Sequence, residues 1–490
     1  MKKTTCNQYE FKLWLVLLST VSLVFAYYSL TFFWGNHDWD WVKGTTQVLS
    51  LNTGMFEGRY GKFILNVALF GGQIFPILNN LVAFALLALG GVLLTKYWQI
   101  KEFYMEIIVA LLPLLSPFIL GWMYFPINIL GNFSAVALVS GGLCLSEKKI
   151  IYKIIAVICW LVALGVYPSV MEMMIICFCF RYILKPLKLA EILKNATPVL
   201  LTLLLFKLLL WGLGELKWVV SDYYNLKTVS LEELIYRTPQ MIELAFSQLI
   251  TTLPFIELKF KALGGIIICA SLLTSCYNKN IFFWIIAFLT TVLSTWLTGT
   301  PEETAYMPRV NFYGLNFFYT GALAVLLQKK GWGRNLGYLL GVAMLCQSVS
   351  ANISAQKVWN LGKNAEEQLV ERISLRLEEN ITDRVIPVIA GTLSLRPRYY
   401  AENYQKESPY LLNAPFMVRH IPSGMFNFYA IAPIFHGVSQ ISAMSDELYR
   451  FLQIAKRPYP AREAIYIDNM YAVILLTSEG IAAIQAQMPR

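Results

Sequence analysis

Long apolar runs separated by short polar segments dominate this chain and restrict what it can fold into. Each run is close to the roughly 20 residues that a helix needs to cross a bilayer. Only 14% of the residues are charged, whereas soluble domains have about a quarter. We therefore predict an all-α polytopic membrane domain over residues 1–354, with about 11 transmembrane helices. The runs lie near 13–33, 76–95, 104–120, 127–145, 151–166, 168–184, 197–213, 263–276, 281–298, 311–328 and 335–351.

The first run follows Met1-Lys2-Lys3, as the core of a signal peptide would. A cleavable signal peptide has a shorter apolar core and small residues at its cleavage site, whereas this run ends in Thr31-Phe32-Phe33-Trp34. We expect it to be a retained anchor. The run from 63 to 75 is separated from the next span by Gly71-Gly72 and Pro76, which predicts a membrane-surface or re-entrant helix.

Lysine and arginine are distributed unequally between the two sides of this layout. The short loops on one side hold Lys43, Arg59, Lys62 and Arg309, whereas the N-terminal tail and the other loops hold Lys2, Lys3, Lys12, Lys96, Lys101, Lys148, Lys149, Lys153, Arg181, Lys185, Lys188, Lys194, Lys279, Lys329, Lys330 and Arg334. Because basic loops stay in the cytoplasm, we predict a cytoplasmic N-terminus and an outer C-terminal region. The same bias explains most of the net charge of +10 without a nucleic-acid partner.

The composition changes from about Ala355. Alternating charges from Glu366 to Glu379 predict a solvated amphipathic helix. Strand patterns follow at 385–391 and 471–477, with a helix pattern at 441–454 between them. We predict a small extracytoplasmic α/β domain over residues 355–490. An amphipathic stretch over 211–261 predicts helices that lie on the membrane surface.

Polar residues gather where the chain first leaves the membrane. Asn36-His37-Asp38-Trp39-Asp40-Trp41 is followed by Glu57-Gly58-Arg59-Tyr60-Gly61-Lys62. Transfer of a sugar from a lipid phosphate to a hydroxyl needs a base for the acceptor proton and positive charge on the departing phosphate. Asp38 and Asp40 supply carboxylates, one as the base and the other to position it or the acceptor. Arg59 and Lys62 can neutralise a phosphate, and Trp41 can stack on a sugar. His37, Glu57 and Arg309 are the other residues that we expect to bind substrate.

Each assignment has a structural alternative. The tryptophans lie at a membrane interface, where aromatic anchors are common. His37 can cap its loop, and no second ligand at a usual spacing predicts a metal site there. Glu57 and Arg59 can form a surface ion pair. Arg309, two residues before Asn311, can reach a lipid phosphate or can snorkel. Within the spans, Glu172 and Lys207 are ionisable groups of the kind that is often functional in membranes.

The layout resembles that of the GT-C superfamily and, within it, the phage-type O-antigen glucosyltransferases that modify lipopolysaccharide. Asp38 and Asp40 match the acidic pair of the first outer loop, and Glu57-Gly58-Arg59-Tyr60 matches the element before the second span. The strand pattern at 385–391 and Pro458-Tyr459-Pro460 match the tail.

This resemblance implies a bacterial inner-membrane glycosyltransferase with a periplasmic C-terminal domain. It implies a polyprenyl-phosphate sugar donor, glucose being favoured, a cell-surface polysaccharide acceptor, and a donor synthase and a flippase as partners. It implies no cofactor.

Two other classes fit the hydropathy. An O-antigen polymerase or ligase also spans the membrane many times, but we expect it to depend on basic residues of a later loop. A flippase or transporter more often has interrupted helices and several charges at the bilayer midplane, whereas the polar residues here concentrate at the outer ends of the spans.

Overall fold

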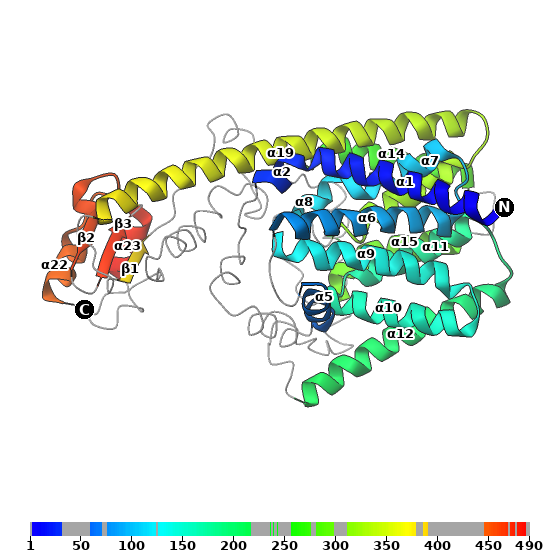
Figure 1. The fold of residues 1–490 in the computed structure, drawn as a ribbon, viewed down its shortest axis with the longest axis horizontal. Coiled ribbons are helices and arrows are strands. Elements are labelled where there is room, and N and C mark those ends of the chain that lie inside the picture. The colour runs from blue at the N-terminus through cyan, green and yellow to red at the C-terminus, as the bar shows by residue number, and fades with distance from the viewer. Residues whose placement is uncertain are drawn as a thin grey trace. The chain divides into compact units, whose positions relative to one another are not determined.

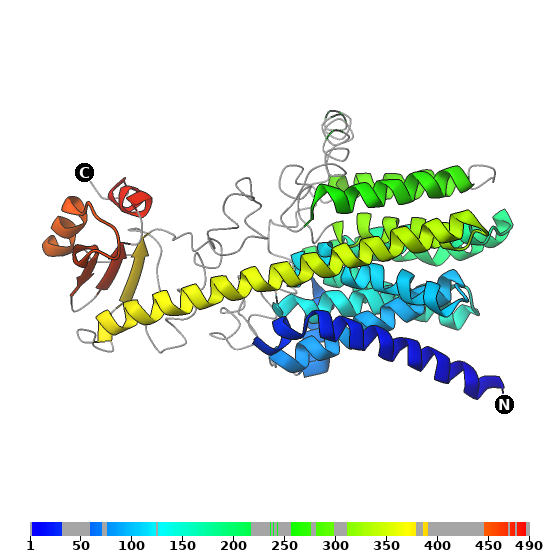
Figure 2. The ribbon, with the colours of Figure 1, turned by 90° about the horizontal axis from the view of Figure 1, so that it is seen from above.

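The structure, a computed structural model, describes residues 2–31, 59–70, 76–123, 126–216, 256–275, 281–297, 311–378, 386–390, 445–468, 471–475 and 478–486, together with Tyr236, Pro239 and Glu243. These residues divide into two compact units, one up to Gln356 and one from Lys357 onward. The first unit is helical, and Figures 1 and 2 show its helices side by side. Its elements are α1 (Lys2–Val24), α2 (Ala26–Thr31), α5 (Tyr60–Phe70), α6 (Pro76–Trp98), α7 (Phe103–Leu115), η2 (Pro117–Ile119), α8 (Leu120–Met123), α9 (Pro126–Ser146), α10 (Ile150–Val166), α11 (Val170–Leu184), α12 (Leu189–Glu215), α14 (Leu258–Ser275), α15 (Ile281–Leu297), α18 (Leu315–Leu327) and the first part of α19 (Trp332–Glu378).

Several of these helices are suited to a membrane. Within the described ranges, five are long and apolar enough to cross one, namely Ile77–Trp98, Phe103–Met123, Asn128–Ser146, Leu189–Glu215 and Trp332–Lys357. Two shorter apolar helices cover Ile150–Val166 and Ile281–Thr291. The described helices are therefore compatible with the predicted all-α membrane architecture, while the count of eleven spans stays a prediction.

Large apolar side chains point away from the core of this unit. On α10, Ile151, Ile154, Ile155 and Ile158 are exposed, while Trp160 on the same helix is fully buried. On α12, Leu200, Leu204 and Leu208 form an exposed stripe with a spacing of four residues. An apolar stripe of this kind faces lipid in a membrane protein, because lipid does not penalise exposed apolar surface as water does.

The two ends of the bundle follow from the directions of its helices. Helices α1 and α6 run antiparallel, because Glu10 pairs with Lys96 at 2.7 Å and Phe25 stacks on Phe84 with ring centroids 5.7 Å apart. We call one end the Arg59 end; it carries Ser29, Arg59, Tyr167 and Gly314. The opposite end, which we call the Lys148 end, carries Glu10, Lys96, Glu147, Lys148 and Arg334.

Pro113 and Pro117 interrupt the helical hydrogen bonding between α7 and α8, and asparagines from other helices bond to the backbone carbonyls that are left over. Pro117 has no N–H to offer the carbonyl of Pro113, four residues earlier. Asn316 Nδ2 on α18 donates to that carbonyl at 3.2 Å. Asn352 Nδ2 on α19 donates to the carbonyl of Leu115 at 2.7 Å. Buried backbone groups inside a membrane must be satisfied within the protein, so these two amides stabilise the break.

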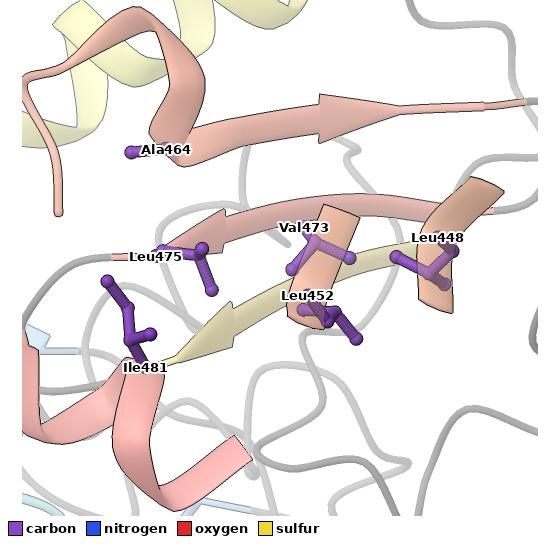
Figure 3. Packing of buried hydrophobic residues seen from close by; sticks show 6 residues of the cluster. All are labelled: Leu448, Leu452, Ala464, Val473, Leu475 and Ile481. Atoms are coloured by element: carbon purple, nitrogen blue, oxygen red, sulfur yellow. The ribbon is translucent and has the colours of Figure 1, made fainter. Parts of the chain in front are cut away.

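The second unit contains a three-stranded sheet in the order β1-β3-β2. Strand β1 (Ile386–Ala390) is parallel to β3 (Tyr471–Leu475), with Ile386 opposite Tyr471. Strand β2 (Ile465–Ile467) is antiparallel to β3 and follows η5 (Arg462–Ala464). Two helices, α22 (Asp446–Ile454) and α23 (Ser478–Ala486), pack on the sheet. Figure 3 shows the core, which contains Leu448 and Leu452 of α22, Ile481 of α23, Ala464 of η5, and Val473 and Leu475 of β3.

The predicted elements of this unit are present with narrower bounds. The expected strands at 385–391 and 471–477 correspond to β1 and β3, and the helix expected at 441–454 begins at Asp446, where Ser445 Oγ accepts from the N–H of Leu448 at 3.1 Å. Strand β2 was not predicted because three residues are too few to reveal an alternating pattern. The charged helix expected after Ala355 is not separate, because α19 runs without a break from Trp332 to Glu378. Between 217 and 255, in the predicted surface-helix stretch, only Tyr236, Pro239 and Glu243 are described, as helical residues.

Candidate functional site

A close crossing of α5 and α10 positions the two basic residues of the Gly-Arg-Tyr-Gly-Lys element. A Cβ atom on Gly61 would lie 2.0 Å from the carbonyl oxygen of Val162, and one on Gly165 would lie 2.7 Å from the backbone nitrogen of Gly61. Small residues permit this backbone contact. Beside it, Tyr60 donates to the carbonyl of Leu161 at 2.8 Å. Burial raises the pKa of Tyr60, so its hydroxyl stays protonated and acts as a donor.

The Arg59 side chain lies on an aromatic cluster formed by Trp122, Tyr167 and Tyr313. Its Cζ atom is 5.7 Å from the centroid of the Tyr167 ring, within the range of a cation–π interaction. Tyr167 contacts Trp122 edge to face at 4.8 Å and stacks on Tyr313 at 6.2 Å. Tyr313 is fully buried, and its hydroxyl donates to Asn132 Oδ1 at 3.0 Å. The Arg59 guanidinium therefore lies on the Tyr167 ring, which in turn stacks on the buried Tyr313 ring.

Two further charged groups are buried at the same end. Lys62, one turn along from Arg59, is only 6% exposed, and Glu172 on α11 is 1% exposed. Glu172 lies against the N-terminus of α18, where a Cβ on the N-cap residue Gly314 would be 2.3 Å from its Oε2. A helix N-terminus favours a carboxylate because its N–H groups carry partial positive charge. Ionisable groups are costly inside a membrane bundle, and buried ones commonly mark functional sites.

The structure places only some of the predicted site residues. Arg59 and Lys62 are described, and the structure brings them together with Glu172 and the aromatic cluster. His37, Asp38, Asp40, Trp41, Glu57 and Arg309 lie outside the described residues. Lys207 is exposed on α12, away from this cluster's buried layer. The sequence analysis did not single out Trp122, Gly165, Tyr167 or Tyr313 as site residues.

The arrangement can bind an anion that is attached to an apolar group. A guanidinium and an ammonium together neutralise a phosphate, and the guanidinium adds oriented N–H donors. The apolar bundle and its exposed leucine and isoleucine stripes suit a lipid chain. Over the part of the chain that the structure describes, no three His, Cys, Asp or Glu side chains gather as metal ligands.

The Arg59 end is thus the candidate functional site, on geometric grounds alone. Comparisons of this chain with family models, with curated proteins and with solved structures find no match.

Proposed function

We propose that this protein is a membrane glycosyltransferase. It moves a sugar, with glucose favoured, from a polyprenyl-phosphate donor to a cell-surface polysaccharide such as O-antigen. The observation that carries the proposal is the Arg59 guanidinium on the Tyr167 ring, with Lys62 and Glu172 buried at the same end of an apolar bundle. Cations and aromatic rings at the end of a lipid-exposed bundle match the headgroup of a lipid-linked sugar phosphate.

The role of Arg59 and Lys62 in this reaction is to stabilise the departing phosphate. When the sugar leaves, the bridging oxygen gains negative charge, and the lipid phosphate goes from one negative charge to two. A positioned guanidinium binds that charge more strongly in the transition state than in the ground state, which accelerates the step. The cation–π contact with Tyr167 reduces the number of positions that the guanidinium can adopt before the donor binds.

Asp38 and Asp40 are the proposed carboxylates of the site, one as the base for the acceptor hydroxyl and the other as a positioning group. Support comes from the two described residues that flank their segment. Thr31 ends α2 and Arg59 precedes α5, and both belong to the Arg59 end. A segment joined to that end on both sides can deliver a carboxylate to the donor.

The membrane placement belongs to the same proposal. Eleven spans with a cytoplasmic N-terminus put the Arg59 end and the C-terminal unit on the periplasmic side of a bacterial inner membrane. A donor synthase would then load the lipid on the cytoplasmic side, and a flippase would carry it across.

The test is a transfer assay in membranes that contain the protein, polyprenyl-phosphate glucose labelled in the sugar, and polysaccharide acceptor. The wild type should transfer label, and Asp38→Asn or Asp40→Asn should abolish transfer while the protein still inserts normally. Mass spectrometry of the surface polysaccharide should show one added hexose per modified repeat. Polysaccharide that grows in whole repeats would indicate a polymerase. Labelled lipid that crosses the membrane without transfer would indicate a flippase; either result would overturn the proposal.

A further inference from the structure

Among the described residues, buried polar atoms without a hydrogen-bond partner occur at several levels of the helical unit, and one group of them lies toward the Arg59 end. Among the described residues, no hydrogen-bond partner is present for Ser29 Oγ, Asn79 Oδ1, Asn128 Oδ1, Trp122 Nε1 or either amide atom of Asn80. Asn80 is 1% exposed and Trp122 is 3% exposed. We call Ser29, Asn79, Asn80, Trp122 and Asn128 the polar layer. A buried polar atom without a partner destabilises the fold, so several of them at one level of the bundle are candidates for contacts with a ligand.

The rings of Phe25, Phe84 and Phe133 indicate at which level of the bundle the polar layer lies. Phe84 on α6 stacks on Phe25 at 5.7 Å and on Phe133 of α9 at 6.2 Å. The N–H of Ser29 bonds to the carbonyl of Phe25, so Ser29 lies one helical turn beyond that ring. Asn80 lies one turn before Phe84, and because α1 and α6 are antiparallel, both side chains lie one turn closer to the Arg59 end than the stacked pair.

Asn128 and Trp122 extend the layer toward Arg59. Asn128 lies in the first turn of α9, about one turn before Phe133, and α9 runs in the same direction as α6. Trp122 follows on α8, where Tyr28 donates to the neighbouring Met123 carbonyl at 2.5 Å. The Trp122 ring also contacts Tyr167, which carries the Arg59 guanidinium. Trp122 and Tyr167 therefore connect the layer to the Arg59 guanidinium.

The chemistry of the layer differs from that of the platform. Its members offer hydroxyl, amide and indole groups, both donors and acceptors, and none carries a formal charge. A phosphate would need the cations of Arg59 and Lys62, whereas a neutral ring with several hydroxyls can pair with such a set.

We infer that the polar layer binds the hexosyl group of the lipid donor, while Arg59 and Lys62 bind its phosphate. This inference rests on the proposed function and adds the location of the sugar. We assign the donor sugar because Trp122 connects the layer directly to the platform that would hold the phosphate, and a sugar and its own phosphate must lie side by side.

The experiment measures binding of two radiolabelled lipids to the full-length protein in lipid nanodiscs, polyprenyl-phosphate glucose and polyprenyl phosphate. The wild type should prefer the glycosylated lipid. Asn80→Leu should reduce this preference by about tenfold, equivalent to about 1.4 kcal/mol, and should leave the affinity for polyprenyl phosphate unchanged. The melting temperature of ligand-free Asn80→Leu should not fall, because no protein hydrogen bond to Asn80 is lost.

Asn316→Leu is the matched control, since Asn316 is equally buried at 1% exposure but bonds to the Pro113 carbonyl. It should lower the melting temperature and keep the sugar preference. The inference is overturned if Asn80→Leu melts as low as Asn316→Leu, because Asn80 would then have a structural partner. It is also overturned if Asn80→Leu keeps the wild-type preference for the glycosylated lipid, because the layer would then hold only water. A third contrary result would be that Asn80→Leu weakens only the binding of the acceptor polysaccharide.

The two proposals fail separately. A wild type that transfers sugar, combined with an unchanged preference in Asn80→Leu, removes the inference alone. A wild type that binds the glycosylated lipid through Asn80 but transfers nothing removes the proposed function alone.

Discussion

The two ends of the helical unit differ in the polar contacts that their side chains make. At the Lys148 end, charged side chains meet partners of opposite charge. Arg181 makes two hydrogen bonds to the Glu147 carboxylate, at 2.9 and 3.1 Å, and Arg334 bonds to Glu102 at 2.9 Å. At the Arg59 end, a guanidinium lies on an aromatic ring, a carboxylate faces a helix N-terminus, and the polar layer lacks protein partners among the described residues.

We interpret the polar contacts of the Lys148 end as ones that stabilise the fold, and those of the Arg59 end as parts of the proposed site. The ion pairs and the Asn316 and Asn352 bonds satisfy groups that the fold would otherwise leave exposed to lipid. At the Arg59 end, the side chains of the polar layer have no hydrogen-bond partner among the described residues. A protein commonly accepts such local cost at a functional site and compensates for it elsewhere. Four substitutions at the two ends test this reading.

The largest expected effect is on turnover in Arg59→Ala. Removal of one oriented donor to a developing oxyanion costs on the order of 2.7 to 4 kcal/mol, or about a hundredfold or more in rate. Initial rates at saturating lipid donor should fall by this factor. Arg334→Ala, which removes an arginine at the other end, should keep the wild-type rate. Near-normal turnover in Arg59→Ala would make Arg59 an anchor for the membrane interface.

Gly61→Ala should give the next largest effect on activity. Its new methyl group would lie 2.0 Å from the Val162 carbonyl oxygen, so α5 must move away from α10 and take Arg59 and Lys62 with it. We expect a loss of transfer of at least about tenfold, since small displacements of positioning groups are costly. In Gly212→Ala of α12, the added methyl meets nothing within 4 Å and should leave transfer intact. Equal activity in both variants would show that the close crossing is dispensable.

Arg181→Leu should affect stability and not catalysis. Arg181 is 2% exposed and holds Glu147 through two charge-assisted bonds, and it also lies over the Tyr97 ring at 5.7 Å. Loss of a hydrogen bond to a charged group costs about 1.5–3 kcal/mol, which should appear as a lower melting temperature in detergent. Turnover measured below that temperature should match the wild type. A specific loss of turnover would assign a catalytic role to the Lys148 end as well.

The smallest effect is expected from Lys96→Ala. Its ion pair with Glu10 spans 2.7 Å, but both side chains are partly exposed, at 53% and 31%. Exposed pairs contribute about 0–1 kcal/mol. The melting temperature should therefore change little, and the change should shrink at high salt because ions screen exposed charges. A drop as large as that of Arg181→Leu would mean that this pair is shielded from solvent.

Among the described elements, most helices of the first unit, helix α22 and strands β1 and β3 could be predicted from the sequence alone, whereas α23 and β2 were not predicted. Apolar runs of bilayer length are local signals, and a helix satisfies its own backbone hydrogen bonds without reference to other segments. Strands β1 and β3 carry enough alternating or apolar residues to be recognised, whereas β2 is too short. Arg59 and Lys62 stood out because charges next to an apolar run are rare. Glu172 stood out as an ionisable group within a span.

Only the tertiary structure brought the rest of the site together. The contact between Gly61 and Gly165, the Trp122, Tyr167 and Tyr313 cluster, and the alignment of Ser29 with Asn80 all depend on how helices distant in sequence cross and in what register. No local pattern specifies that register, because a rotation of one helix by a single residue would preserve its hydropathy and still turn a side chain by about 100°. Side-chain packing across the whole bundle selects one register, and with it the residues that meet at the Arg59 end.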